Sequence, residues 1–340
     1  MSARKTFALP GQRGLDGMLL EKNRNSAQEI ERQAACFTLV YSPAPAYVND
    51  HCFIADCNGV VHLFHITGVS GRSPYFPGNE VSFGHAVSQD LRSWDGQPNL
   101  LSPSPSTTYE PDHIYAPFII HKDQRFYMFY AGVSKKAMLE SICLAWSDDL
   151  VHWEKFPYNP VFRPSIHWAE YKPHSGVWGC CRDPHVIPHP SYGFILYYVT
   201  WIKGANGMLA AFGAALSENL VSWQDAGPVH IRERAAEYST TSMESPCVIE
   251  RNGLYHLFYK HRDETRLVIS DDPLNFTDKE DIWFSPAHAA EVFRFNNQWY
   301  ISSCSREVND TAHRYSDRTK GLYLARLNWD DVLPRVEPFE

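Results

Sequence analysis

The segment "FGHAVSQDLRSWDG" (Phe83–Gly96) recurs along the chain and decides the fold. Its echoes are "ICLAWSDDLVHWEK" from Ile142, "FGAALSENLVSWQD" from Phe212, "TRLVISDDPLNFTD" from Thr265 and, in degenerate form, "GLYLARLNWDDV" from Gly321. The full copies have an alternating apolar run, then a serine with an acidic or amide residue, then an aromatic residue. This pattern predicts a strand, a turn and an aromatic ring packed within or between repeats, and we assign Trp94, Trp153 and Trp223 to that packing.

Two more apolar runs precede each copy. The nearer runs are rich in aromatic residues, and the first runs are "NDHCFIA", "IYAPFII", "RDPHVIP", "ESPCVIE" and "AAEVFRF". The chain therefore holds five units of about 50 to 70 residues, each with at least three strands. Strands repeated radially in this way predict an all-β fold, a five-bladed β-propeller over residues 47–340. A β-solenoid or a sandwich is the alternative, but five copies in one strand order disfavour it.

Residues 1–46 precede the first unit as an N-terminal extension. "SAQE" (Ser26–Glu29) has the spacing of a helix capping box and is followed by "IERQAACF", which predicts a short helix near residues 27–35. The extension could cover an edge of the propeller or mediate homo-oligomerisation. The chain stops soon after the fifth unit, so we expect no C-terminal β-sandwich.

Composition limits the partners and the compartment. The net charge of −8 disfavours nucleic acid and anionic membranes, and no run reaches the roughly 18 apolar residues of a membrane span. The N-terminus lacks an apolar signal core, so we expect a cytoplasmic protein with reduced cysteines. The eight cysteines include no CxxC pair. We therefore interpret them as small buried hydrophobes and expect no zinc or other metal site and no cofactor.

Carboxylates begin three of the five first runs, at places that we interpret as equivalent: Asp50, Asp183 and Glu244. The fifth run has Glu291, with His288 shortly before it. The first strand of a propeller blade lines the central channel, so these acids are expected to converge. Burying a carboxylate costs several kcal/mol unless it is paired or faces a cleft. A single acid could simply bind backbone amides, but three acids at one rim predict a functional site.

Glycoside hydrolysis is the chemistry that needs such a set. One carboxyl must donate a proton to the leaving oxygen, and a second must attack the anomeric carbon or activate water. Proximity separates the pKa values of neighbouring acids, so one cluster can hold both roles. A third acid can stabilise the positive charge of the transition state. Arg182, beside Asp183, could bind a substrate hydroxyl or hold a carboxylate.

These motifs resemble those of the five-bladed propeller glycosidases, above all glycoside hydrolase family 32, the invertases and fructosidases. The resemblance covers roughly residues 45–330 and rests on Asn49-Asp50, "RDP" at Arg182–Pro184, "ESP" at Glu244–Pro246 and the segment Phe83–Trp94. It implies that Asp50 is the nucleophile, Glu244 the acid/base and Asp183 the transition-state stabiliser. It also implies that Asn49 and Arg182 contact the sugar.

The sequence departs from the family pattern at several places. His51 stands where proline usually follows the Asn-Asp pair, and Ser245 stands where cysteine is usual. The "YAP" at Tyr115 is similar to the related family 43. We add Tyr115, His288 and Trp178 as candidate substrate-binding residues. Other histidines near the motifs (His85, His113 and His185) are more often structural in such positions.

The leading prediction is a retaining furanosidase or transglycosidase that acts on β-fructofuranosides and needs no cofactor. One alternative is an inverting furanosidase of the family 43 type, with Asp50 as general base. Separations of about 5–5.5 Å between the carboxyls predict retention, and about 6.5–9.5 Å predict inversion. The second alternative is a sugar-binding propeller without catalysis.

Overall fold

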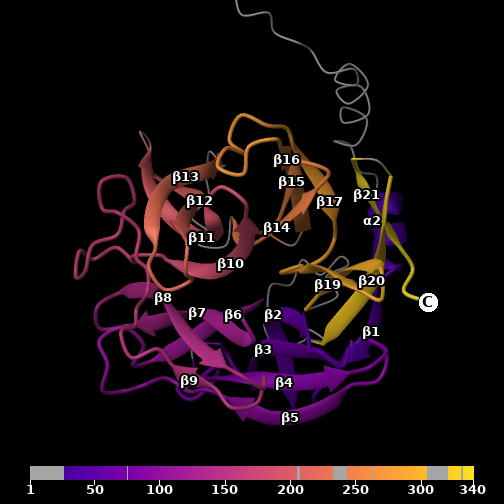
Figure 1. Ribbon diagram of the computed structural model, residues 1–340, viewed down its shortest axis with the longest axis horizontal. Coiled ribbons are helices and arrows are strands. Elements are labelled where there is room, and N and C mark those ends of the chain that lie inside the picture. Colours follow the sequence, from indigo (N-terminus) through magenta and orange to yellow (C-terminus); the bar gives the residue numbers. More distant parts are fainter. Residues whose placement is uncertain are drawn as a thin grey trace, which may run out of the picture.

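Five antiparallel sheets follow one another around a common axis in the computed structural model (Figure 1). The structure describes residues 27–74, 76–204, 207–232, 243–262, 264–304, 321–330 and 332–340. The first four sheets have four strands each. They are β2 (Ala46–Ala55), β3 (Val61–Val69), β4 (Ser82–Ser88) and β5 (Asp95–Leu100); β6 (His113–Lys122), β7 (Arg125–Ser134), β8 (Leu139–Ser147) and β9 (Glu154–Lys155); β10 (Arg182–His189), β11 (Gly193–Gly204), β12 (Gly207–Ser217) and β13 (Gln224–Arg232); and β14 (Glu244–Arg251), β15 (Leu254–His261), β16 (Glu264–Ser270) and β17 (Asp281–Ser285). The prediction of a five-bladed propeller is confirmed.

The fifth blade joins the two ends of the described chain. It contains β18 (Val292–Phe295), β19 (Gln298–Ser303) and β20 (Leu322–Trp329), and β20 pairs with both β1 (Thr38–Tyr41) and β21 (Pro334–Glu337). Strand β1 lies in the segment that we assigned to the extension, so the last blade takes a strand from before residue 47. This pairing ties the start of the ring to its end and helps to close it.

The predicted short helix is present as α2 (Ala27–Ala34). Its partner is the outer strand β17, and the cysteine that follows it packs among apolar residues of the fourth and fifth blades. In Figure 1 the helix lies beside β21, at the rim of the ring. Among the described residues, no helix combines the length and apolar character needed to cross a membrane. Whether the extension mediates homo-oligomerisation stays a prediction.

The repeated Ser–x–Asp/Asn–Leu segment forms the turn between the third and fourth strands of a blade. In the second blade, Ser147 Oγ accepts hydrogen bonds from the backbone N–H groups of Asp149 and Leu150, at 3.2 and 2.9 Å. Leu150 has a positive φ of 65°, and its carbonyl accepts the indole N–H of Trp153. The serine thus holds the backbone in a conformation that leucine alone would avoid.

The ring of Trp153 packs against Phe64 of the first blade, with ring centroids 5.8 Å apart. Trp223 packs in the same way against Phe129 of the second blade, at 5.6 Å. Each tryptophan therefore contacts the preceding blade, as expected of a residue that repeats with the fold.

Replacing Ser147 by alanine should lower the free energy of unfolding by about 1–3 kcal/mol, because the backbone N–H groups of Asp149 and of the buried Leu150 lose their acceptor. Chemical denaturation followed by fluorescence measures this loss. The control is Ser93→Ala in the corresponding turn of the first blade, where the serine is exposed. The control should stay within about 0.5 kcal/mol of the parent. Equal effects of the two substitutions would contradict the role of the serine hydroxyl.

Candidate active site

The inner strand of each blade contains a β-bulge, and these bulges form the site. In the second to fourth blades, two residues of the inner strand face one residue of the next strand: Ala116-Pro117, Asp183-Pro184 and Ser245-Pro246. The first blade has the same bulge at Asn49-Asp50. In the fifth blade, Cys304 N–H donates to His288 O and Ser302 N–H to Glu291 O, so the bulge spans residues 289–290.

The bulges hold their residues in a strained conformation. Ala116, Asp183, Ser245 and Ala289 have φ angles of 49°, 53°, 52° and 47°. Residues other than glycine seldom adopt such angles, and they concentrate at functional sites. Proline follows three of these four residues and fixes the next φ. The bulge in each inner strand turns successive side chains and N–H groups toward the channel.

The prediction that the three acids occupy equivalent places is only partly right. All three acids lie at or beside a bulge, but at three different positions: Asp50 is the second residue of its bulge, Asp183 is the first, and Glu244 lies one residue before its bulge, opposite Lys260. Glu244 therefore occupies the position that Arg182 holds in the third blade. The error came from aligning the acids by their apolar runs, which do not reveal where a bulge begins.

The bulges line one pocket of about 280 Å³, open to solvent. Its walls include Asp50, Asp183 and Ser245, and its other residues are His51, Ala116, Pro117, Pro184, Pro246, Ala289 and Glu291. Ser245 bridges the two aspartates. Its hydroxyl donates to Asp50 Oδ1 at 3.2 Å, and its backbone N–H donates to Asp183 Oδ2 at 2.9 Å. The serine thus fixes two carboxylates that lie 133 positions apart in the sequence.

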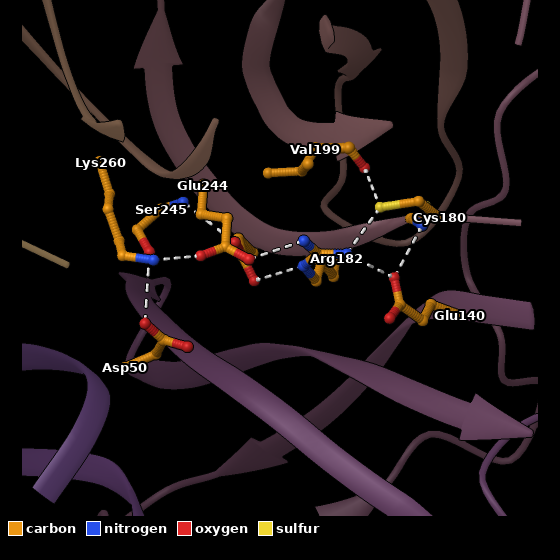
Figure 2. A network of polar contacts seen from close by, with 10 residues as sticks. Asp50, Glu140, Cys180, Arg182, Val199, Glu244, Ser245 and Lys260 are labelled. Carbon is orange, nitrogen blue, oxygen red and sulfur yellow. Dashed lines mark hydrogen bonds and ion pairs between the residues drawn. The ribbon is translucent and has the colours of Figure 1, made fainter. Parts of the chain in front are cut away.

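Two cations hold Glu244 at the edge of this group (Figure 2). Arg182 Nη2 donates to one carboxylate oxygen at 2.8 Å, and Lys260 Nζ donates to the other at 2.5 Å. The Lys260 side chain is 7% exposed and points toward both Glu244 and Asp50 (Figure 2). Arg182 also approaches Asp183 Oδ1, at 3.8 Å. Three carboxyls and two cations therefore meet at the mouth of the channel.

Arg182 is held in turn by the second blade. Its Nη1 lies 3.4 Å from Glu140 Oε2 and donates to Cys180 Sγ at 3.0 Å (Figure 2). Glu140 is buried on β8 and also accepts the backbone N–H of Cys181. Sequence reasoning missed both Lys260 and Glu140. Each of them is a charged residue within a largely apolar strand, "LYHLFYKH" for Lys260 and "LESICLAWS" for Glu140. Neither strand is the first of its blade, and the prediction of the site rested on first strands alone.

The site separates the proton affinities of its acids. Burial, and next the charge of Glu244, raises the pKa of Asp50. Burial likewise raises the pKa of Asp183, although Arg182 lowers it. Burial alone would also raise the pKa of Glu244. The positive charges of Lys260 and Arg182 together outweigh burial, so the pKa of Glu244 is lowered. The surroundings therefore favour ionisation of Glu244 and disfavour ionisation of the two aspartates.

The other predicted site residues lie at different distances from this centre. Asn49 is in the first bulge, where its amide donates to Glu80 at 3.4 Å and accepts from Cys304. Tyr115 directly precedes the second bulge, as Glu244 precedes the fourth. His288 precedes the fifth bulge, and its charge acts on the pKa values of Asp50 and Glu244.

Trp178 is placed differently. It is half-buried and packs against the apolar cluster of the third and fourth blades, and it is not among the residues that line the pocket. A substrate contact for this residue stays a prediction, as it does for Tyr115 and His288.

Comparison with known proteins agrees with this arrangement. The family "Glycosyl hydrolases family 32 N-terminal domain" matches residues 41–246. Sucrose-6-phosphate hydrolase of Bacillus subtilis is 27% identical over 192 residues, which cover 55% of this chain and 35% of that protein. Fructan 6-exohydrolase of Beta vulgaris is 28% identical over 189 residues, 52% of this chain and 28% of the relative. The chain thus spans about a third of the length of the curated relatives it matches.

Solved structures share the fold. The family 32 β-fructofuranosidase of Bombyx mori has a TM-score of 0.62 and 17% identity, covering 96% of this chain and 69% of that one. A thermostable family 43 glycoside hydrolase has a TM-score of 0.61 and 16% identity, covering 87% and 95%. Because the family match takes in more than half of the residues, including Asp50, Asp183 and Glu244, the chain belongs to glycoside hydrolase family 32.

Proposed function

We propose that the protein hydrolyses β-fructofuranosides with retention of configuration. The observation that carries this proposal is the convergence of three acids: Asp50 and Asp183 line one pocket, and Glu244 lies beside them in contact with Arg182, all within the residues that the family match covers. The relatives include proteins described as sucrose-6-phosphate hydrolase and fructan exohydrolases, which supports a fructosyl group as the substrate unit.

In the proposed reaction, a carboxylate oxygen of Asp50 attacks the anomeric carbon while the bond to the leaving oxygen breaks. Glu244 gives its proton to that oxygen, and the same residue then removes a proton from the water that releases the fructosyl group. Transfer to a second sugar in place of water would give transglycosylation. Asp183, fixed by Ser245 N–H, binds ring hydroxyls and stabilises the positive charge that develops on the ring.

The protonation of the free site adds a condition to this mechanism. Glu244 must hold a proton when the bond breaks, yet Lys260 and Arg182 favour its ionised form. A substrate whose oxygens take over hydrogen bonds from Lys260 would weaken that ion pair and raise the pKa of Glu244. We propose that substrate entry shifts a proton from the aspartates to Glu244, whose carboxylate lies beside them in the same cluster of charges.

A substrate panel tests the proposal. Purified protein is incubated with sucrose, sucrose 6-phosphate, inulin, levan and aryl arabinofuranosides and xylosides, and released monosaccharide is measured. We expect fructose from one or more of the fructosides, and NMR of the early product should show the retained anomer. Hydrolysis of only the arabinoside or xyloside, or an inverted product, would reject the proposal. Binding of a fructoside without turnover would favour a sugar-binding propeller instead.

Ser245→Ala should lower kcat/KM on the best fructoside roughly 10- to 100-fold. The substitution removes the hydroxyl that donates to Asp50 and keeps the backbone N–H that donates to Asp183. A hydrogen bond to a carboxylate contributes about 1.5–3 kcal/mol, which corresponds to that range. The control is Ser245→Cys, which places the usual family residue here and retains a weak donor; it should lose less activity. Equal kcat/KM for Ser245→Ala and the parent would contradict the bridging role.

We propose a cytoplasmic location. All eight cysteines of the chain lie in described segments, and none forms a disulfide there. Free thiols suit a reducing compartment. Fractionation of the native host, with detection by antibody, tests this placement.

A further inference from the structure

Below the acids, three consecutive inner strands present a different kind of side chain to the channel. His185, Cys247 and Glu291 each follow directly after the bulge of their strand, so they share one level of the propeller. One ligand-type atom from each of them lies within 4.8 Å of the others. Glu291 also lines the pocket that contains Asp50. Glu291 therefore connects the cluster to the pocket, and the cluster is not needed for the proposed acid chemistry.

His185 is held in the form that binds metals. Its Nε2 donates to the backbone carbonyl of Val248 at 3.2 Å, which leaves the lone pair on Nδ1. Nδ1 is buried and has no hydrogen-bond partner among the described residues; it lies 3.9 Å from Glu291 Oε2. The residue is 4% exposed, and burial lowers its pKa to about 4, so the ring is neutral. Metal-binding histidines are typically oriented by such a hydrogen bond from the opposite ring nitrogen.

The other two side chains complete the donor set. Cys247 is fully buried, and its sulfur accepts the backbone N–H of Val292 at 3.3 Å. The carboxyl of Glu291 is 16% exposed, its Oε2 lies 3.9 Å from His185 Nδ1, and it forms a hydrogen bond with the side chain of Cys247. A carboxylate in such surroundings is costly unless a cation is present.

We propose that His185, Cys247 and Glu291 bind one divalent transition-metal ion, with Zn²⁺ the best match. A nitrogen, a sulfur and an oxygen donor suit Zn²⁺, whereas Ca²⁺ and Mg²⁺ prefer oxygen ligands alone. Usual zinc bond lengths place tetrahedral ligand atoms about 3.4–3.8 Å apart, so His185 Nδ1 and Glu291 Oε2, 3.9 Å apart, are close to that spacing, and the cluster as a whole, within 4.8 Å, must contract on binding. Three protein ligands leave a fourth position for water, on the side of the pocket.

This proposal departs from the expectation of no metal site that we drew from cysteine spacing. The three residues come from three successive blades, with 62 positions from His185 to Cys247 and 44 from Cys247 to Glu291, so no CxxC-type motif marks them. A dication at this level would also favour the ionised form of Asp50. Binding of the ion does not depend on the proposed hydrolysis.

Cobalt substitution tests the site without an activity assay. The full-length protein is stripped with a chelator, and Co²⁺ is added while visible and near-ultraviolet absorption is recorded. We expect one equivalent to bind, with the visible bands of a tetrahedral site and a thiolate-to-cobalt charge-transfer band; one equivalent of Zn²⁺ should abolish both. Cys247→Ser should remove the charge-transfer band. Loss of a residue that only supports a metal ligand weakens metal binding roughly 10- to 100-fold. His185 is proposed as a ligand itself, so His185→Gln should weaken Co²⁺ binding by more than that.

Two control variants locate the thiolate. Cys143 is as buried as Cys247 but lies on β8, and Cys57 is the exposed cysteine; Cys143→Ser and Cys57→Ser should both bind Co²⁺ like the parent. Circular dichroism verifies that each variant folds. The proposal is wrong if no stoichiometric binding occurs, if Cys247→Ser binds like the parent, or if Cys57→Ser loses the band. It is also wrong if Ca²⁺ alone binds and Cys247→Ser does not alter that binding.

Discussion

Asp50→Asn is expected to lower kcat on a β-fructofuranoside by on the order of 10⁴-fold or more. The amide has nearly the shape of the carboxylate, so the pocket should persist, but it cannot form the glycosyl–enzyme bond that the proposed mechanism requires. Ser245 Oγ can still donate to the remaining carbonyl oxygen. The measurement is initial-rate fructose release by parent and variant at matched protein concentrations.

A matched substitution separates this effect from damage to the hairpin. Asp56 lies on the same hairpin and accepts hydrogen bonds from the N–H groups of Asn58 and Val60, away from the pocket. Asp56→Asn makes the same chemical change and should retain nearly full activity. If Asp50→Asn turns over fructosides as fast as Asp56→Asn, Asp50 is not the nucleophile. If both variants are misfolded and equally impaired, the loss of activity comes from disruption of the hairpin. The assignment of Asp50 as nucleophile then fails its test.

Glu244→Gln should show a smaller loss, about 10²- to 10⁴-fold, as is typical when a general acid is removed. The loss should shrink for aryl fructosides with good leaving groups, because these need less protonation. A loss that is independent of the leaving group would contradict the role of Glu244 as proton donor.

The architecture could be predicted because its cause is local. The segment from Phe83 carries strand alternation, a serine that accepts turn N–H groups and a tryptophan that packs on the neighbouring blade, and all three recur in register. A repeated local motif defines a repeated unit, and radial stacking follows from the number of strands in each unit. The acids were found for a similar reason: a carboxylate before an apolar run is visible in the sequence.

What escaped prediction depends on cross-strand pairing and on positive φ. Lys260 reaches Glu244 because β15 pairs opposite β14, and the register of that pairing is decided by a bulge whose start the sequence does not mark. The contact of Glu140 with Arg182 joins two blades, and no spacing along the chain relates them. The same holds for the cluster of His185, Cys247 and Glu291. Contacts across a channel follow from the ring as a whole, so sequence periodicity cannot reveal them.

Lys260→Met is expected to shift the basic limb of the pH profile of kcat/KM to higher pH by about one unit or more. That limb reports loss of the last proton from the coupled acids Glu244 and Asp50 in the free enzyme, and the charge of Lys260 acts to lower the pKa of both. Lys260 favours ionised Glu244 and so lowers its pKa; without the ammonium group the pKa of Glu244 rises and the protonated form persists to higher pH. The control is Lys260→Arg, which keeps the positive charge opposite Glu244 and should retain the position of the limb.

Stability provides a second measurement that is independent of catalysis. Because the pKa of Glu244 is lower in the folded state than in the unfolded chain, its ionisation stabilises the fold above the unfolded pKa of about 4.3, and this contribution is lost as the pH falls toward the folded value. The parent should therefore lose more unfolding free energy than Lys260→Met between about pH 5 and pH 3. Identical pH dependence of stability, together with an unmoved basic limb, would show that Lys260 does not control the proton of Glu244. The acid would then have to be sought among the aspartates, whose pKa values the buried site raises.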